Sequence, residues 1–325
     1  MILAAAAVLI ATIAGTGLVL YFLRRHAILD HPNARSSHAI PVPRGGGIAV
    51  VAVLITAWVA LAAPVFSTEF LIILAGALGL AVVSWIDDLR SLPAGIRLLA
   101  QAAAVLPASI WLTGPVFQGW LPAPLDTAAT VLIWLWFVNL FNFMDGIDGI
   151  SGIEAACVGG GTALIAWLAP AAGLDPVFGL TLAAAALGFL AWNWHPAKIF
   201  LGDVGSVPLG FLLGWLLLKL AESGHWAPAI ILPLYYLADA TITLLRRARR
   251  GERVWQAHRE HYYQKAVQRG LSHATVSAAI GTANLMLLGI AVFSIHSPWP
   301  ALAGATAIVA ALLIWLSRPG MVAKT

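Results

Sequence analysis

The sequence predicts an all-α polytopic integral membrane protein, and three observations support this fold class. Hydrophobic residues make up 61% of the 325 residues and charged residues only 10%, a composition far from that of soluble domains. Apolar segments of roughly 20 residues, enough for a helix to cross a ~30 Å hydrocarbon core, recur along the whole chain. The basic residues gather in alternate connections between these segments. No linker divides the chain, so we expect one membrane-embedded domain over residues 1–325.

The apolar pattern predicts about eleven transmembrane helices, at residues 2–23, 46–63, 70–86, 96–113, 127–143, 151–169, 176–193, 207–221, 227–245, 273–295 and 299–317. The first segment has no basic residue before its apolar stretch and is followed by Arg24 and Arg25. We therefore expect a first membrane helix there rather than a cleaved signal peptide.

The distribution of Lys and Arg predicts that the N-terminus lies outside and the C-terminus lies in the cytoplasm. With this orientation the cytoplasmic segments are the tail from Arg318 and the connections 24–45, 87–97, 144–150, 194–206 and 246–272. They contain all of the 18 Lys and Arg residues except Lys219, in agreement with the positive-inside rule. Lys219 is near an outer end, and we expect its side chain to snorkel to the membrane interface. The polar motifs lie in the cytoplasmic connections, so we expect active-site loops on that face.

Two amides and two carboxylates, Asn139, Asn142, Asp145 and Asp148, recur at every third position where the fifth segment ends. Each step of three drifts by about 60° around a helix, so the four cannot share one face. We expect the helix to end near Met144 and the two Asp-Gly pairs to form a turn. Acids at the C-terminal end of a helix oppose its dipole, so a divalent cation should lie among them. The alternative is a solvated interfacial loop that happens to be acidic.

Further acids end the third segment and occupy the fourth inner connection. The adjacent carboxylates of Asp87 and Asp88 would repel each other unless they share a cation, although a simple interfacial cap is the alternative. Asp203 lies between two glycines that let the backbone curl around a ligand. Nearby, Lys198 is a candidate phosphate contact, and Ser206 is a plausible N-cap for the following helix.

Basic and histidine residues lie on both sides of this acidic set. His38 and Arg44 precede a triple glycine at the predicted start of the second helix, where free N–H groups favour anions; the alternative is that they only enforce topology. His258 and His261 would be neighbours on a helix but lack a further ligand for zinc. The basic run 246–253 suits anionic lipid head groups or a charged soluble substrate.

Together these residues predict a chemistry that joins a soluble compound to a lipid. Aspartate and asparagine oxygens suit Mg²⁺, with Mn²⁺ as the alternative ion, and the basic groups suit a diphosphate. The pattern indicates a phosphoryl-type transfer between a soluble nucleotide compound and a lipid. A transporter of anionic lipid or nucleotide sugar is the alternative from another class, but it should place its polar groups near the middle of the bilayer. Nucleic acid is not an expected partner.

Five motifs in order carry a resemblance to a known family: DHPNARSSH…PVPRGGG, SWIDDL, NLFNFMDGIDGISG, KIFLGDVGS and HREHYYQ. From Asp30 to Gln264 the chain resembles the polyprenyl-phosphate N-acetylhexosamine-1-phosphate transferases, glycosyltransferase family 4. The resemblance implies transfer of a sugar-1-phosphate from a UDP-sugar to undecaprenyl phosphate, with Mg²⁺ and release of UMP. It also implies a bacterial inner (cytoplasmic) membrane enzyme with its active site on the cytoplasmic face, and suggests a homodimer.

The resemblance also assigns roles to individual residues. Asp203 would be the leading Mg²⁺ ligand, with Asp87 and Asp88 next to it. Asp87, or else Asp88, would deprotonate the lipid phosphate; a covalent aspartyl-phosphate route remains the alternative. The nucleotide, its diphosphate and the sugar would be contacted by Asn139, Asn142, Asp145, Asp148, His258 and His261.

Three departures from the family pattern narrow the function. Ser36 follows Arg35 where many members carry a lysine, and Arg44 is the candidate to take over the role of that lysine. Ser91 stands where members often show a third acid after the Asp-Asp pair. The last loop lacks the three adjacent histidines of the branch that uses UDP-N-acetylmuramoyl-pentapeptide. We therefore expect the branch that starts polysaccharides such as O-antigen, with UDP-GlcNAc, UDP-FucNAc or UDP-QuiNAc as donor. The phospho-N-acetylmuramoyl-pentapeptide transferase of peptidoglycan synthesis is the alternative.

Overall fold

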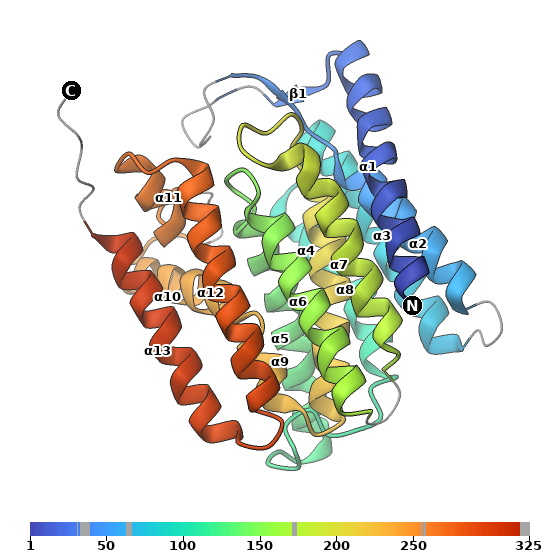
Figure 1. The fold of residues 1–325 in the computed structure, drawn as a ribbon, viewed down its shortest axis with the longest axis vertical. Coiled ribbons are helices and arrows are strands. Elements are labelled where there is room, and N and C mark those ends of the chain that lie inside the picture. The colour runs from blue at the N-terminus through green and yellow to red at the C-terminus, as the bar shows by residue number, and fades with distance from the viewer. Residues whose placement is uncertain are drawn as a thin grey trace.

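The computed structural model describes residues 1–30, 32, 40–62, 67–170, 174–254, 256 and 258–318, and these residues form a helical bundle (Figure 1). A short antiparallel pair, β1 (Leu29–Asp30) and β2 (Val42–Pro43), follows the first helix. The helices are α1 (Ile2–Arg25), α2 (Gly47–Ala62), α3 (Thr68–Arg90), α4 (Ala94–Ser109), α5 (Ala123–Phe143), α6 (Ile150–Leu168), α7 (Pro176–Asn193), α8 (Asp203–Glu222), α9 (Trp226–Ile231), α10 (Leu234–Arg249), α11 (Tyr262–Gln268), α12 (His273–Phe293) and α13 (Pro298–Ser317).

The helices confirm the predicted polytopic membrane class. Within the described residues, eight helices are long and apolar enough to cross a membrane: α1, α3, α5, α6, α7, α8, α12 and α13. Two more, α2 and α4, are apolar but have only 16 residues, which at 1.5 Å per residue is short for a ~30 Å core. Within the part of the chain that the structure describes, length and composition therefore do not confirm the predicted total of eleven full spans.

The ninth predicted segment, 227–245, is not one continuous helix. It divides at Leu232 and Pro233 into the short α9 and the longer α10. Proline has no N–H to donate and fixes its own φ, so it interrupts a helical ladder. Three arginines lie in the last turn of α10, so the end of this helix is strongly charged, unlike an apolar membrane span. The prediction of a single span here is wrong because the apolar character of the segment does not offset the interruption by proline.

Helix α8 forms the centre of the bundle. All residues of its most apolar 18-residue stretch are buried, whereas only 17% of the corresponding stretch in α1 is buried. Helices α2, α3, α5 and α6 pack around it. The indole Nε1 of Trp134 donates to the Phe211 carbonyl over 3.0 Å and joins α5 to this central helix. The first residues of α8 therefore occupy a fixed position from which the site is built.

One end of the bundle collects the connections that the sequence predicts to be cytoplasmic. In Figure 1, β1, α11 and the α7–α8 connection lie at this end, the upper one in the view. The α7–α8 connection is fastened to β2, because the Phe200 N–H donates to the Pro43 carbonyl over 2.8 Å. It is also fastened to the start of α2, where the Gly47 N–H donates to the Leu201 carbonyl over 2.8 Å. Arg44 and Asp203, far apart in the chain, are thereby brought together.

Candidate functional site

A cavity of about 820 Å³ lies at this end, between α3, α4, α5, α8 and α10. Its polar lining consists of Ser84, Asp87, Arg97, Gln101, Asn139, Asn142 and Asp203. The rest of the wall is almost entirely apolar. Three of the apolar side chains, Leu98, Leu99 and Leu132, are 52%, 72% and 67% exposed, so the apolar side of the cavity opens towards the lipid-facing surface. The cavity thus combines a polar end with an apolar wall.

Asp88 fixes the start of α8 next to this cavity. Its Oδ1 accepts from Arg44 Nε over 3.0 Å and from the Asp203 N–H over 3.1 Å. Its Oδ2 accepts from the Val204 N–H over 3.0 Å. The side chain of Asp88 is 3% exposed, and it satisfies N–H groups that a helix start leaves without partners. This geometry gives Asp88 a positioning role and leaves it little capacity for the metal contact expected from the sequence.

Asp88 also corrects the predicted start of α8. The helix begins at Asp203, after Gly202 with a φ of +75°, and not at Ser206. Ser206 lies inside the helix, where its Oγ accepts from Asn142 Nδ2 over 2.9 Å. The predicted N-cap is wrong because Asp88, distant in sequence, supplies the acceptor for the first N–H groups.

Asp203 and Asp87 present their carboxylates to the cavity. Arg44 Nη2 donates to Asp203 Oδ1 over 2.9 Å. Asp87 Oδ1 accepts from the Leu92 N–H just beyond the end of α3, and Arg97 Nη1 lies 3.4 Å from Asp87 Oδ2. The carboxylates of Asp87 and Asp203 are close enough to interact. Two neighbouring carboxylates with amide oxygens nearby are a suitable donor set for a hard divalent cation.

The acidic turn after α5 forms as predicted. Helix α5 ends at Phe143, Met144 is its C-cap, and Gly149 has a φ of +80° before α6 begins. Asn139 and Asn142 line the cavity. Asn139 Nδ2 donates to Gln101 Oε1 over 2.6 Å, which holds the amide pair in place. The four polar residues therefore do not share one helix face.

Asp145 lies in this turn, within electrostatic range of Arg44 and Asp203. Burial raises the pKa of Asp145 to about 6, although a hydrogen bond from Ser151 acts in the opposite direction and lowers it. For Arg44, burial alone would lower the pKa, but Asp203 and Asp88 raise it well above its ordinary value. The guanidinium of Arg44 is therefore permanently charged. It is a fixed cation next to three acids, Asp88, Asp145 and Asp203.

Two of the predicted substrate contacts lie away from the cavity. Asp148 is buried and accepts hydrogen bonds from His195 and from the Ala197 N–H. Burial would raise its pKa, but His273 and His195 together lower it. The ammonium of Lys198 lies 5.3 Å from the centre of the Trp192 ring, and Lys198 does not line the cavity. His38 lies outside the described residues.

Of the two histidines in the last inner connection, His261 is held by Asp239. His261 is buried, and its Nδ1 lies 3.2 Å from Asp239 Oδ1. The same carboxylate accepts the Tyr262 N–H over 3.0 Å at the start of α11. The His258 ring lies 4.8 Å from that of His261, and burial, with His261 next, lowers the pKa of His258 to about 4. His258 is therefore neutral at pH 7, and His261 is engaged inside the protein.

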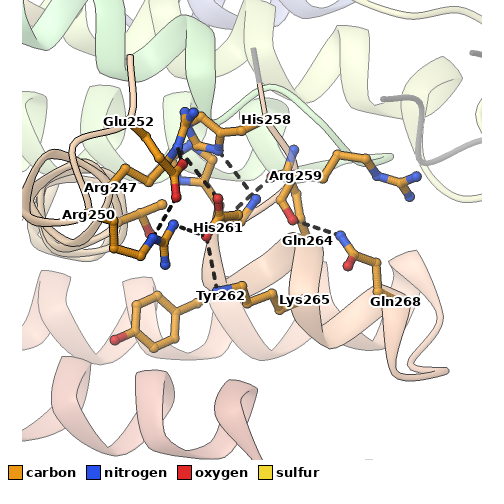
Figure 2. A network of polar contacts seen from close by, with 12 residues as sticks. Arg247, Arg250, Glu252, His258, Arg259, His261, Tyr262, Gln264, Lys265 and Gln268 are labelled. Carbon is orange, nitrogen blue, oxygen red and sulfur yellow. Dashed lines mark hydrogen bonds and ion pairs between the residues drawn. The ribbon is translucent and has the colours of Figure 1, made fainter. Parts of the chain in front are cut away.

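The basic run of this connection is partly neutralised by its own acids, as Figure 2 shows. Arg247 Nε donates to Glu252 over 2.8 Å. Arg250 donates over 2.6 Å to each of Glu252 and Glu260. These pairs fold the connection on itself, so only part of the predicted positive charge is available to a ligand.

Helix α11 places this connection against the acidic turn. The Tyr263 hydroxyl donates to the Phe143 carbonyl over 3.1 Å. A Cβ on Gly146 would collide with the same hydroxyl, so glycine is needed there for close approach. The first Asp-Gly pair and the last inner connection are therefore built against each other.

Sequence reasoning missed four polar residues around the site. Arg97 and Gln101 line the cavity from α4; their spacing of four places them on one face of an otherwise apolar helix, and this signal could have found them. His195 and His273 meet at Asp148. No local pattern predicts that contact, because Asp148 comes from the α5–α6 connection, His195 from the α7–α8 connection and His273 from the start of α12.

Several known proteins are similar in sequence to this chain over most of its length. The model of "Glycosyl transferase family 4" matches residues 70–221. A probable undecaprenyl-phosphate N-acetylglucosaminyl 1-phosphate transferase of Bacillus subtilis is 30% identical over 263 residues, covering 75% of this chain and 71% of the relative. A decaprenyl-phosphate N-acetylglucosaminephosphotransferase of Mycolicibacterium smegmatis is 30% identical over 313 residues, covering 81% and 74%. An undecaprenyl-phosphate alpha-N-acetylglucosaminyl 1-phosphate transferase of Escherichia coli is 26% identical over 309 residues, covering 87% and 82%.

Proposed function

Because the chain belongs to glycosyl transferase family 4, the polyprenyl-phosphate N-acetylhexosamine-1-phosphate transferases, we propose that it transfers N-acetylglucosamine-1-phosphate from UDP-GlcNAc to undecaprenyl phosphate and releases UMP. The observation that carries this proposal is the cavity with acids and amides at one end and an apolar wall that opens towards lipid. A phosphate head on an isoprenoid chain has the same division into a charged end and an apolar body. Such a cavity admits the acceptor sideways from the membrane.

Asp203 and Asp87 would hold Mg²⁺, which would neutralise charge on the donor diphosphate. Asp203 is oriented for this by Arg44, and α8 is anchored by Asp88. Arg97, at the mouth of the same cavity, is placed to bind the acceptor phosphate. Asp87 lies beside Arg97 and would take the proton from that phosphate, whose oxygen then attacks the β-phosphorus of the donor. The bond to the α-phosphate breaks and UMP leaves.

The names of the relatives and the charge pattern support a proposal for the donor and the location. The relatives are named for N-acetylglucosamine, which favours UDP-GlcNAc over UDP-FucNAc, UDP-QuiNAc and the muramoyl-pentapeptide donor. A product of this kind would start a lipid-linked polysaccharide such as O-antigen. The basic connections support a bacterial inner membrane location with the site on the cytoplasmic face.

The test is release of UMP by purified protein supplied with undecaprenyl phosphate, Mg²⁺ and each UDP-sugar in turn. We expect release with UDP-GlcNAc that requires the lipid and stops on chelation. Asp203→Asn and Asp87→Asn should each lower kcat by about 100-fold or more, as expected when a group that stabilises transition-state charge is removed.

The matched control is Asp175→Asn, which makes the same chemical change at the N-cap of α7. Asparagine also caps helices well, so this variant should keep full activity. Folded protein that gives no lipid-dependent UMP with any donor would contradict the proposal, and transport of the same compounds would then be measured.

A further inference from the structure

A groove of about 570 Å³ lies on the outside of the bundle, between α1 and the end of α7. Its lining consists of Gly17, Leu20, Tyr21, Arg24, Arg25 and Trp192. None of these residues lines the cavity that contains Asp87 and Asp203. The groove is therefore a separate feature, and the proposed transfer reaction does not use it.

The last turn of α1 places this groove at the level of lipid head groups. A helix of 24 residues is about 36 Å long, which exceeds a ~30 Å hydrocarbon core, so its ends reach the polar zone of the membrane. Leu18 and Phe22, next to the groove on the same helix, are exposed, as expected for a surface that faces lipid. Figure 1 shows this end of α1 beside β1, at the end of the bundle that collects the predicted cytoplasmic connections.

The groove carries positive charge that the protein does not neutralise. Within the described residues, neither Arg24 nor Arg25 forms an ion pair; Arg25 Nη1 donates to the Tyr21 hydroxyl over 3.4 Å. The ammonium of Lys198 lies 5.3 Å from the centre of the Trp192 ring, so a third cation flanks the groove. A guanidinium presents several N–H donors in a planar fork that matches phosphate oxygens. The polar rim of the groove therefore suits a phosphate group.

A tryptophan and a glycine shape the apolar floor of the groove. Trp192 Nε1 donates to the Ile13 carbonyl over 2.9 Å, which fixes the indole against α1. A Cβ on Gly17 would lie 3.0 Å from that ring, so the glycine leaves room for it. Tyr21 and Trp192 each have an apolar body and a polar tip, and such residues gather where membrane meets water. The groove thus has the apolar floor and basic rim that a lipid with an anionic head group needs.

We propose that this groove binds the head group of an anionic phospholipid. The two arginines contact its phosphate, and the upper part of an acyl chain lies along Leu20 and Trp192. Basic pockets between membrane helices on the cytoplasmic side are known to recognise such head groups. The lipid also lies against the start of the α7–α8 connection, because the Lys198 N–H donates to the Trp192 carbonyl over 2.9 Å. This inference does not depend on the proposed function.

The test measures how tightly the purified full chain binds phosphatidylglycerol and phosphatidylcholine with identical acyl chains, by native mass spectrometry. We expect phosphatidylglycerol to bind about 10-fold more tightly. Arg24→Gln and Arg25→Gln should each weaken its binding by about fivefold, as expected for one basic residue at a lipid head group, and leave phosphatidylcholine binding unchanged. Arg90→Gln removes the same charge at the exposed end of α3 and is the matched control, which should bind like wild type.

A second variant separates a shaped groove from general attraction by charge. Gly17→Leu keeps both arginines but fills the space beside them, so it should weaken phosphatidylglycerol binding as much as Arg24→Gln does. Gly79→Leu is its control, because a Cβ there meets nothing within 4 Å. Thermal unfolding in detergent without added lipid identifies any variant that is not folded. If Gly17→Leu does not fold, the two arginine variants still decide the test.

Four results would overturn the proposal. One is equal binding of the two phospholipids by wild-type protein. Another is a loss of phosphatidylglycerol binding in the arginine variants that is no larger than in Arg90→Gln. The third is unchanged binding by folded Gly17→Leu, which would mean that anionic lipid is attracted without a groove. The fourth is release of bound phosphatidylglycerol by an equal amount of undecaprenyl phosphate, which would make the groove a site for the acceptor.

Discussion

Asp88 shows how a single carboxylate can organise a site from behind the cavity. It contacts Arg44 and two N–H groups of α8, so it sets the direction in which the next acid, Asp203, points. Its neighbour Asp87 lines the cavity instead. Adjacent residues on a helix point about 100° apart, which is why an Asp-Asp pair that looks uniform in the sequence has two different tasks.

Asp145 should make the stability of the protein depend on pH. Its pKa of about 6 in the folded state exceeds the value near 3.9 of an unfolded chain, so ionisation favours unfolding. The free energy of unfolding is highest below about pH 4 and falls as the pH rises to about 6. Asp145→Asn removes this penalty, and it should be more stable than wild type at pH 7.5 by up to about 3 kcal/mol.

Thermal unfolding in detergent, with chelator present, measures this difference. The advantage of Asp145→Asn should shrink towards zero at pH 4, where the wild-type side chain is largely protonated in the folded state. An equal advantage at both pH values would show that the substitution acts through packing and not through charge.

At the scale of elements, α2 and α8 touch backbone to backbone. A Cβ on Gly47 would overlap the backbone of Gly205, and a Cβ on Gly205 would lie 2.6 Å from Gly47 Cα. Small residues of this kind let membrane helices approach closely. Gly47 is three residues beyond Arg44, and Gly205 is two residues beyond Asp203. The contact between the two glycines therefore also fixes the distance between Arg44 and Asp203.

Gly47→Ala should therefore reduce both stability and activity. The added methyl group overpacks the contact, which lowers the free energy of unfolding by about 1–3 kcal/mol. It should also lower kcat, because it pushes Arg44 and Asp203 apart. Gly79→Ala in α3 is the control, because a Cβ there meets nothing within 4 Å. Thermal unfolding and UMP release measure the two effects; a Gly47→Ala protein as active as the Gly79→Ala protein would contradict the argument.

The same elements show what could be predicted from the sequence. Runs of apolar residues locate α3, α5 and α12 closely, because lipid favours long apolar helices whatever they contact. The turn after Phe143 was also predictable, because three-residue spacing cannot follow one helix face. The pairing of Arg44 with Asp203 was not, since 159 residues separate them and periodicity gives the face of a helix but not its partner. The division at Pro233 is visible locally, but the apolar residues around it favour a continuous span.

At the scale of the whole molecule, a buried ion cluster lies on the opposite end of α8 from Asp203. Lys219 contacts Glu222 and lies 3.5 Å from Glu69, with its side chain only 9% exposed. Trp215 Nε1 donates to Glu69 over 3.1 Å, and the Gly114 N–H donates to Glu222 over 3.1 Å. The cluster joins α3, α8 and the connection after α4 at this end. The prediction that Lys219 snorkels to the interface is therefore wrong, because these acids hold its ammonium inside the bundle.

Lys219→Met should destabilise the protein by about 1–3 kcal/mol, because it leaves the buried carboxylate of Glu222 and the partly exposed carboxylate of Glu69 without their cation. The donor KM should not change, since the substitution is at the end of α8 distant from Asp203. A double variant that also carries Glu222→Gln should recover part of the stability. Thermal unfolding of both proteins measures the effect, and an unchanged melting temperature for Lys219→Met would show that the cluster contributes nothing.

The exposed leucines along the cavity have a consequence for how this enzyme must be assayed. An acceptor that enters sideways is never dissolved in the bulk solution, so its concentration is a mole fraction within the bilayer or micelle. Adding detergent at constant total lipid would then slow the reaction by surface dilution, while the dependence on the water-soluble donor stayed the same. In a cell, the supply of acceptor would be governed by two-dimensional diffusion in the membrane, and competition would come from every other protein that draws on the same pool.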